Sequence, residues 1–255
     1  MKKEEKMKKW KTAIQMYTLR EALEQDFKGV CRELVKLGCD GAEFVAIFGG
    51  MAPDELAAFL KEIGLKACGL HLSCEDLTSN KIPRSFEYAK ALDIHYLTFS
   101  YGGDFTKVTP EVTALCAKAG GTAARNGFQF TYHNHAAEFA DFEGMHALDY
   151  IYSHTDPHQV MAELDVYWIA KGGEDPVKYI RKYASRLPQL HLKDMDREDG
   201  SFTELGNGCI DLEACVKAAE ETNCQWLIYE QDICKRPVFE SAAISLAYLN
   251  KILNC

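Results

Sequence analysis

The sequence predicts a single α/β domain of the (β/α)8 TIM-barrel class. Short apolar runs alternate with amphipathic stretches along the 255 residues, and this alternation is typical of repeated strand–helix units. Eight runs of each kind are present, which is the number that a closed parallel barrel requires. No Gly/Ser-rich linker or shift in composition divides the chain, so we predict one domain over residues 1–255. An open doubly wound sheet is the alternative, because it has the same alternation.

The predicted strands are short apolar runs with β-branched and aromatic residues, bounded by turn-forming or polar residues. They cover residues 12–17, 41–45, 66–72, 95–101, 129–133, 161–166, 189–193 and 226–230.

The predicted helices carry apolar residues at helical spacing. They cover residues 27–38, 53–64, 85–93, 111–127, 144–154, 175–186, 211–222 and 240–253. Their ends show the usual signals: Gly38 and Gly64 follow a last periodic residue, Pro53 and Pro176 lie in first turns, and Asp211 precedes the seventh helix.

Composition excludes several classes of function. The chain is 47% hydrophobic and 26% charged, as in ordinary globular proteins. Its net charge of -9 argues against nucleic-acid binding, which depends on Lys and Arg neutralising phosphates. A small, neutral or weakly charged substrate fits better.

The expected location is cytoplasmic. The charged N-terminal leader, residues 1–11, lacks the apolar core of a secretory signal, and no stretch has the apolar length of a membrane span. The ten cysteines form no C-x-x-C pair, so we expect them to be reduced thiols that pack as small hydrophobic residues.

Polar side chains stand at the ends of the last four predicted strands. Asp165 ends VMAELD, His191 lies in LPQLHLKD and Glu230 ends QWLIYE, while the fifth strand offers His133 and Glu138. The ends of parallel barrel strands meet at one rim, where this fold carries its active sites. Carboxylates combined with imidazoles suit Mn, Zn, Co or Mg. The sequence therefore predicts a divalent-metal site with Glu138, Asp165, His191 and Glu230 as ligands.

Each residue also has an ordinary structural interpretation. A strand-end aspartate such as Asp165 frequently caps a helix. His191, between two leucines, faces the barrel axis if the leucines face the helices, although a lone histidine in such a strand is more often a core residue. Glu230 carries the strongest signal, because a buried lone carboxylate costs several kcal/mol unless a cation pairs with it. Glu43 is expected near the pocket rim. Glu163, on the same face as Asp165 but deeper, is expected to support the site from behind.

The fifth strand leaves its ligand open. Strand alternation places His133 and His135 on one face and Asn134 on the other, and Glu138 follows the strand and is free to turn back over the pocket. Either His133 or Glu138 supplies the ligand. Among the earlier strands, His71 in GLHLS belongs to the rim and is expected to bind substrate hydroxyls.

Four segments, YHNHAAEF, LDVYW, HLKDMD and IYEQD, resemble the xylose isomerase-like barrel superfamily. Within it the chain is similar to the sugar phosphate isomerase/epimerase proteins related to ketose 3-epimerases, inosose dehydratase and endonuclease IV. The resemblance runs from IQMYTLRE to IYEQD, almost the whole chain. It implies Asp165, His191 and Glu230 as metal ligands and Arg197 as a substrate-binding residue.

Two positions depart from the ketose 3-epimerase pattern. The glutamate that ends the fifth strand in the epimerases aligns with His133, and the substrate histidine three residues after the aspartate is here Trp168. Trp168 is either a stacking wall for a sugar ring or a core aromatic residue. With Trp168, the predicted substrate-binding residues are His71, His135, Lys193 and Arg197.

The leading hypothesis is a metal-dependent sugar isomerase or epimerase. The metal binds a substrate carbonyl and an adjacent hydroxyl and stabilises an enediolate. Glu230 or Glu138 removes the proton beside the carbonyl, and His133 or His135 relays or returns it.

The alternative is a dehydratase or lyase of a keto-sugar, keto-inositol or keto-glycoside. The additional imidazoles favour it, because departure of hydroxide or alkoxide needs a general acid. DNA repair of the endonuclease IV type is opposed by the acidic charge and the ligand count, and a sugar-binding barrel without catalysis stays open. The sequence leaves open which sugar binds, whether it is phosphorylated, which metal is used and whether the chain forms a homo-oligomer.

Overall fold

The computed structural model describes residues 10–78 and 84–254, and it contains a closed barrel of parallel strands. Going round the barrel, the strand order is β1-β12-β9-β8-β5-β4-β3-β2, and β1 pairs with both β2 and β12. This closure confirms the predicted TIM barrel and excludes the open sheet. The barrel strands are β1 (Lys11–Gln15), β2 (Gly41–Phe44), β3 (Lys66–His71), β4 (Tyr96–Phe99), β5 (Gln129–His133), β8 (Val160–Asp165), β9 (Gln189–Leu192) and β12 (Trp226–Tyr229).

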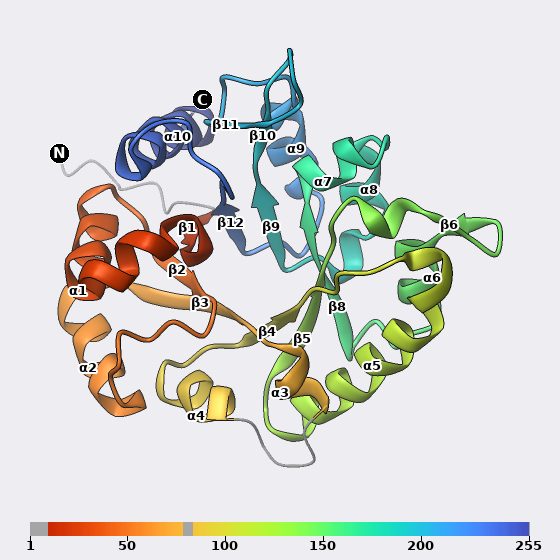
Figure 1. The fold of residues 1–255 in the computed structure, drawn as a ribbon, viewed down its shortest axis with the longest axis horizontal. Helices are drawn as coiled ribbons and strands as arrows, with labels where there is room; N and C mark the ends of the chain where they lie inside the picture. The colour runs from red at the N-terminus through yellow and green to blue at the C-terminus, as the bar shows by residue number, and fades with distance from the viewer. Residues whose placement is uncertain (1–9, 79–83, 255) are drawn as a thin grey trace, which may run out of the picture.

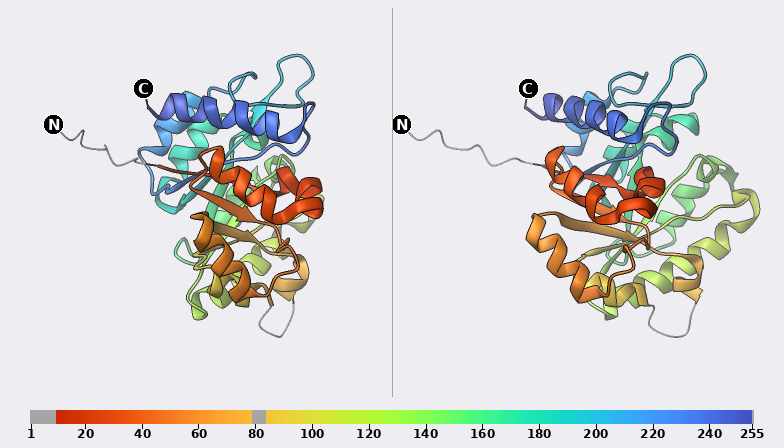
Figure 2. Two further views of the ribbon diagram at one scale, coloured as in Figure 1. Left: turned by 90° about the vertical axis from the view of Figure 1, so that its left-hand side faces the viewer. Right: turned by 60° about the vertical axis from the view of Figure 1, so that its left-hand side comes forward.

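Helices surround the barrel (Figures 1 and 2). They are α1 (Arg20–Lys36), α2 (Pro53–Ile63), α3 (Cys74–Thr78), α4 (Arg84–Ala91), α5 (Phe105–Arg125), α6 (Ala147–Ser153), α7 (Val166–Lys171), α8 (Pro176–Lys182), α9 (Leu212–Ala219) and α10 (Val238–Leu253), with 3-10 turns η1 (Met16–Leu19), η2 (Ala137–Phe139) and η3 (Ala184–Arg186). Each predicted helix overlaps one of these, and α3 and α7 are additional short helices. Two small antiparallel pairs, β6 (Asp141–Phe142) with β7 (Met145–His146) and β10 (Asp194–Met195) with β11 (Phe202–Thr203), lie in loops.

The first helix begins earlier than its sequence pattern predicts. α1 starts at Arg20, but Asp26 has non-helical dihedral angles (φ -151°, ψ 81°) and its carboxylate accepts a hydrogen bond from the backbone N–H of Gly29 at 2.9 Å. Asp26 therefore acts as an N-cap inside the helix. The predicted start at residue 27 is the start of the second half of α1. Of the predicted leader, residues 1–9 lie outside the described part of the chain.

The interior of the barrel has an apolar base and a polar upper part. Ala13, Cys68, Tyr96, Trp226 and Ile228 form a separate buried apolar cluster at the base. One layer higher, the buried side chains are polar or charged: Gln15, Glu43, Thr98, Thr131, His133, Glu163, Gln189 and His191. Leu190 and Leu192 belong to the outer core beneath the helices, so His191 between them faces the axis as predicted. Buried charges of this kind require partners, and these partners form the candidate site.

Candidate functional site

Glu43, on β2, is a fully buried carboxylate at the centre of the polar layer. Its oxygens accept hydrogen bonds from the side-chain amides of Gln15 (2.7 Å) and Gln189 (3.1 Å) and from Nε2 of His191 (2.7 Å). Burial opposes ionisation, but His71 and His191 outweigh it and hold the pKa of Glu43 well below its usual range. Glu43 is therefore an ionised acceptor that fixes the His191 ring. The predicted place at the pocket rim is wrong, because Glu43 is completely enclosed within the barrel.

Glu163, on β8, occupies the same layer. One oxygen accepts a hydrogen bond from the Thr98 hydroxyl at 3.0 Å, and the other lies 3.0 Å from Nε2 of His71, 3.3 Å from Nδ1 of His133 and 3.2 Å from Nε2 of His191. Burial and Glu43 oppose ionisation, but the neighbouring His191 and His71 lower the pKa of Glu163 to about 2. Its position behind the strand end agrees with the supporting role expected for it.

His71 shares both carboxylates. Its Nε2 lies 3.0 Å from Glu163 and 3.2 Å from Glu43. Burial disfavours the charged ring, but the two carboxylates outweigh it and raise the pKa of His71 to about 10. His71 is therefore an imidazolium at neutral pH, and its side chain is still partly exposed to the pocket.

At the upper side of this layer, His133 and His191 converge with Asp165 and Glu230. Each offers one ligand atom, and these atoms all lie within 4.8 Å of one another. Nδ1 of His191 lies 2.9 Å from Oε2 of Glu230, and Nε2 of His133 lies 3.9 Å from Oδ2 of Asp165. The other nitrogen of each ring faces Glu43 or Glu163. Each histidine thus has one nitrogen available to a ligand group and the other directed at a carboxylate, which is the usual arrangement behind metal-binding histidines.

The four residues fit a divalent metal. Two imidazole nitrogens and two carboxylate oxygens are a donor set suited to Zn or Mn. Oδ2 of Asp165 is buried and makes no hydrogen bond, and the ammonium of Lys193 lies 3.2 Å from it. Oδ1 of the same carboxylate accepts the backbone N–H of Trp168 at 3.0 Å and caps α7. The helix-cap and the ligand interpretations of Asp165 are therefore compatible. A second group with the same spacing, His71, His133, Glu163 and His191, lies one layer deeper.

The ammonium of Lys193 lies against this ligand group. Its Nζ is 2.8 Å from Oε2 of Glu230, 3.2 Å from Oδ2 of Asp165 and 2.8 Å from Oδ1 of Asp232. Lys193 is buried, yet the three carboxylates outweigh the burial and raise its pKa. The sequence predicted Lys193 as a substrate-binding residue but missed Asp232. The available signal was the spacing, since Asp232 follows Glu230 by two residues in IYEQD.

The structure does not bring Glu138 into the ligand group. One oxygen accepts a hydrogen bond from the Tyr132 hydroxyl at 2.9 Å, and the other accepts the backbone N–H of His135 at 3.0 Å. Tyr132 belongs to the outer core, so the η2 turn directs Glu138 behind β5, away from the axis. Burial raises the pKa of Glu138 to about 7. Of the two candidates on the fifth strand, the ligand group contains His133.

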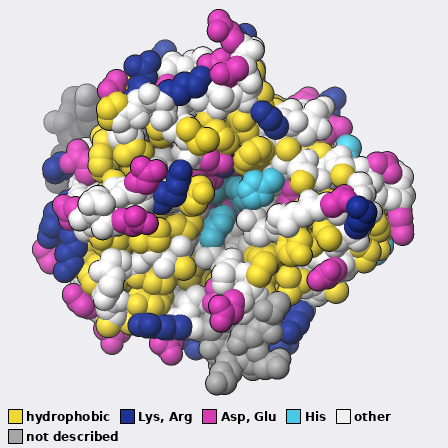
Figure 3. All heavy atoms as spheres, in the orientation of Figure 1, with side chains coloured by type: hydrophobic (Ala, Val, Ile, Leu, Met, Phe, Trp, Pro, Cys, Tyr) yellow, Lys and Arg dark blue, Asp and Glu magenta, His cyan; other side chains and the backbone are white. Residues whose placement is uncertain are grey.

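The pocket above the cluster has a volume of about 260 Å³ and is lined by His71, His133, His135, Lys193 and Glu230 among others. Histidine side chains are visible in a hollow near the middle of the face in Figure 3, with hydrophobic and acidic side chains around it. Burial, followed by the charge of Lys193, lowers the pKa of His135 to about 4, so this ring is neutral.

Two predicted substrate residues do not line this pocket. The Trp168 ring lies behind it, 5.2 Å from the His135 ring and 5.5 Å from Nζ of Lys193. Arg197 is exposed in the loop after β10. Asn134, which the sequence left without a role, accepts the backbone N–H of Asp165 through its side-chain oxygen at 3.0 Å and so positions that residue.

The fold and this site define a TIM barrel with a buried His/Glu/Asp cluster of metal-site spacing at the carboxyl ends of its strands. The model of the xylose isomerase-like TIM barrel family matches residues 31–252, and the chain belongs to this family. Within residues 10–78 and 84–254, no helix combines the length and hydropathy that crossing a bilayer demands.

Individual relatives are more distant. The inosose dehydratase of Clostridium beijerinckii is 30% identical over 154 residues, which are 52% of this chain and 51% of the relative, so the chain spans about half the length of the curated relatives it matches. A sugar phosphate isomerase/epimerase structure from Parabacteroides distasonis is 23% identical, with a TM-score of 0.80 over 94% of this chain and 98% of that one. The IOLI protein, whose structure contains a zinc atom, is 14% identical, with a TM-score of 0.73 over 96% of this chain and 98% of that one.

Proposed function

We propose that this protein is a metal-dependent lyase or dehydratase that acts on a keto-sugar, a keto-inositol or a keto-glycoside. One observation carries the proposal: His133, Asp165, His191 and Glu230 converge to within 4.8 Å beneath a pocket that His71 and His135 also line. A divalent ion held by these four residues would act as a Lewis acid toward a substrate carbonyl. The pocket volume of about 260 Å³ suits a small ring.

The two histidines outside the ligand group, His71 and His135, line the pocket and provide the proton transfers. One ring takes the proton from the carbon beside the ketone, and the other gives a proton to the departing oxygen at the next carbon. One C–H bond and one C–O bond break, a carbon–carbon double bond forms, and water or an alcohol leaves. The product is an enone.

Two features favour elimination over epimerisation. His133 stands where the resemblance places the epimerase glutamate, and Glu138, the nearby substitute, has both oxygens engaged by Tyr132 and His135. The fifth strand therefore offers the pocket no carboxylate at the position where the epimerase pattern has its glutamate, and His133 lines the pocket there instead. The inosose dehydratase relatives are consistent with this choice.

The second candidate is a sugar isomerase or epimerase. The solved structure from Parabacteroides distasonis, described as a sugar phosphate isomerase/epimerase, favours it. The same two histidines would then return the proton to the other face of the carbon or to its neighbour.

Product analysis separates the two functions. The protein is incubated with Mn, Zn, Co or Mg in deuterated water and with a panel of keto-sugars, keto-inositols and keto-glycosides. We expect an enone with loss of water or alcohol. Deuterium in an otherwise intact sugar would instead establish the isomerase or epimerase, and metal-independent turnover would contradict both. Cleavage of abasic DNA would establish the repair activity.

A further inference from the structure

Lys193 places a positive charge on the atoms that the proposed metal site would use. Its Nζ contacts Oε2 of Glu230 at 2.8 Å and Oδ2 of Asp165 at 3.2 Å. Oε2 of Glu230 is also the atom that faces Nδ1 of His191, and Oδ2 of Asp165 is the one that faces His133. The ammonium and a divalent ion therefore compete for the same two oxygens.

Distance and charge make this competition strong. A zinc-type ion binds oxygens at about 2.0–2.2 Å, so an ion shared by these two oxygens would lie close to the ammonium nitrogen. Two cations at such a separation in a buried site repel strongly. The ammonium and the divalent ion therefore cannot bind these two oxygens at the same time while Lys193 keeps the position that the structure shows.

The third partner of Lys193 offers another position. Oδ1 of Asp232 lies 2.8 Å from Nζ, and Asp232 lines the pocket and keeps a fifth of its side chain exposed. A lysine has a flexible four-carbon stem, so a small shift toward Asp232 releases Asp165 and Glu230 while one ion pair is kept. The Trp168 and Phe202 rings, 5.5 and 5.7 Å from Nζ, flank the ammonium.

We propose that Lys193 is a built-in counter-cation: its ammonium neutralises Asp165 and Glu230 when no divalent ion is bound, and it moves onto Asp232 when the ion enters. Metal binding then moves the Lys193 ammonium toward Asp232, where it can donate a hydrogen bond to a substrate oxygen in the pocket. This inference rests on the metal site of the proposed function, and it makes Lys193 a determinant of metal affinity rather than a fixed substrate contact.

Metal titration of purified variants tests the inference without any activity assay. Lys193→Met keeps an unbranched side chain, one heavy atom shorter, and removes its charge. Isothermal titration calorimetry with Mn²⁺ or Zn²⁺ alone should show binding at least tenfold tighter than in the wild type. The matched control is Lys235→Met, because Lys235 also contacts two carboxylates, Asp196 and Asp199, at 3.4 and 3.5 Å but is exposed. The control should leave the affinity unchanged.

Asp232→Asn tests the second position. Without this carboxylate the ammonium loses the third of its three anionic partners, so the metal affinity should fall at least tenfold. Circular dichroism checks that each variant folds. If Lys193→Met does not fold, the same titration is made with Lys193→Gln and compared with that of Asp232→Asn.

The outcomes distinguish this inference from the proposed function. Equal affinity in the wild type and in Lys193→Met would overturn the inference and leave the metal-dependent function standing. Metal uptake by Lys193→Met but not by the wild type would support the inference and overturn the metal-dependent function. No binding by either protein would overturn both.

Discussion

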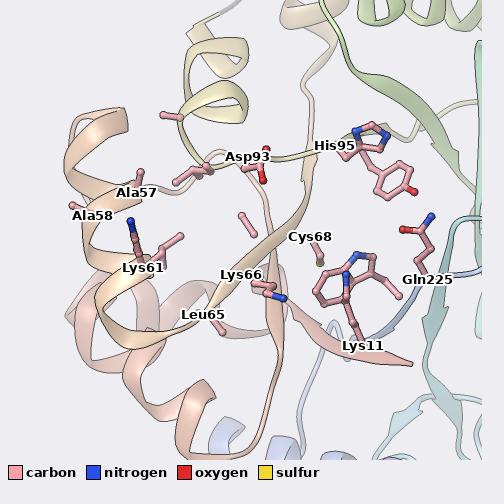
Figure 4. A pocket seen from close by; sticks show the side chains of 16 residues that line it. Lys11, Ala57, Ala58, Lys61, Leu65, Lys66, Cys68, Asp93, His95 and Gln225 are labelled. Atoms are coloured by element: carbon pink, nitrogen blue, oxygen red, sulfur yellow. The ribbon is translucent and has the colours of Figure 1, made fainter. Parts of the chain in front are cut away.

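The two ends of the barrel differ: the larger cavity lies at one end, and the candidate functional site lies at the other. The larger cavity, about 580 Å³, lies at the base, where Lys66 and Cys68 of β3 and Trp226 of β12 line it (Figure 4). The pocket at the carboxyl ends of the strands is less than half that size. At the base the lysines are exposed, and Lys11 lies 5.2 Å from the Trp226 ring centroid.

Among the described residues, the two groups of His, Asp and Glu side chains that have metal-site spacing lie toward the carboxyl ends of the strands. Function at the carboxyl ends and stability at the base is the usual division of labour in this fold. The comparison teaches that the convergence of enclosed charges, and not the volume of a cavity, identifies the site here.

The largest effect is expected at the carboxyl ends. Glu230→Gln removes a proposed metal ligand and leaves the buried Lys193 with one fewer partner. We expect turnover to fall by about 1,000-fold, about 4 kcal/mol of transition-state stabilisation. The measurement is kcat/KM at saturating metal. Lys66→Met at the base is the control and should change kcat/KM less than twofold. A comparable loss in that control would break the contrast between the two ends.

At the base the expected loss is in stability. Trp226→Ala removes the largest side chain of the apolar cluster. Such truncations lower the free energy of unfolding by about 3–5 kcal/mol. Urea denaturation should show this loss in the free energy of unfolding. Metal affinity should stay within twofold of the wild type, and a large change in affinity would show that the base contributes to the site.

An intermediate effect is expected one layer below the ligands. Glu43→Gln keeps the shape of the side chain but removes the charge that accepts the His191 ring N–H. Loss of such a partner typically lowers metal affinity by about 10–100-fold, which calorimetry measures. Glu33→Gln is the matched control, because Glu33 is a partly exposed carboxylate on α1 that pairs with Lys36. An unchanged affinity in Glu43→Gln would mean that the barrel alone holds the ring in place.

The smallest effect on the candidate site is expected for Glu138, which lies near the pocket but outside the ligand group. Burial raises its pKa to about 7 from 4.5, so the folded protein binds more protons than the unfolded one between these values. Its contribution to stability is therefore lost as pH rises from about 4.5 to 7. The free energy of unfolding of the wild type, relative to that of Glu138→Gln, should fall by about 2.5 kcal/mol over this range. A difference independent of pH would contradict the burial argument.

Local patterns were sufficient for most of the fold. The eight strands and eight helices follow from apolar periodicity and end signals, which act over a few residues. The additional helix α7 was missed because the predicted strand ran through Asp165, whose side chain ends the strand and caps the helix at once. α3 is a single short turn with little periodicity of its own.

The site was only partly predictable. The sequence could predict Asp165, His191 and Glu230 as candidates because each ends or occupies an apolar strand, and strand alternation determines the face of a residue within the strand. The structure brings these three side chains together. Glu138 lies beyond β5, where alternation no longer applies, and the η2 turn directs it to Tyr132.

The sequence by itself determined that a barrel forms and that acids and imidazoles gather at its carboxyl ends, because both follow from the period of each segment and the residue at its end. Only the tertiary structure decided which of them touch. Glu43 meets His191 across 148 positions, and Lys193 meets Asp232 across 39. Such pairs depend on the stagger between strands in the closed barrel, which no single segment encodes.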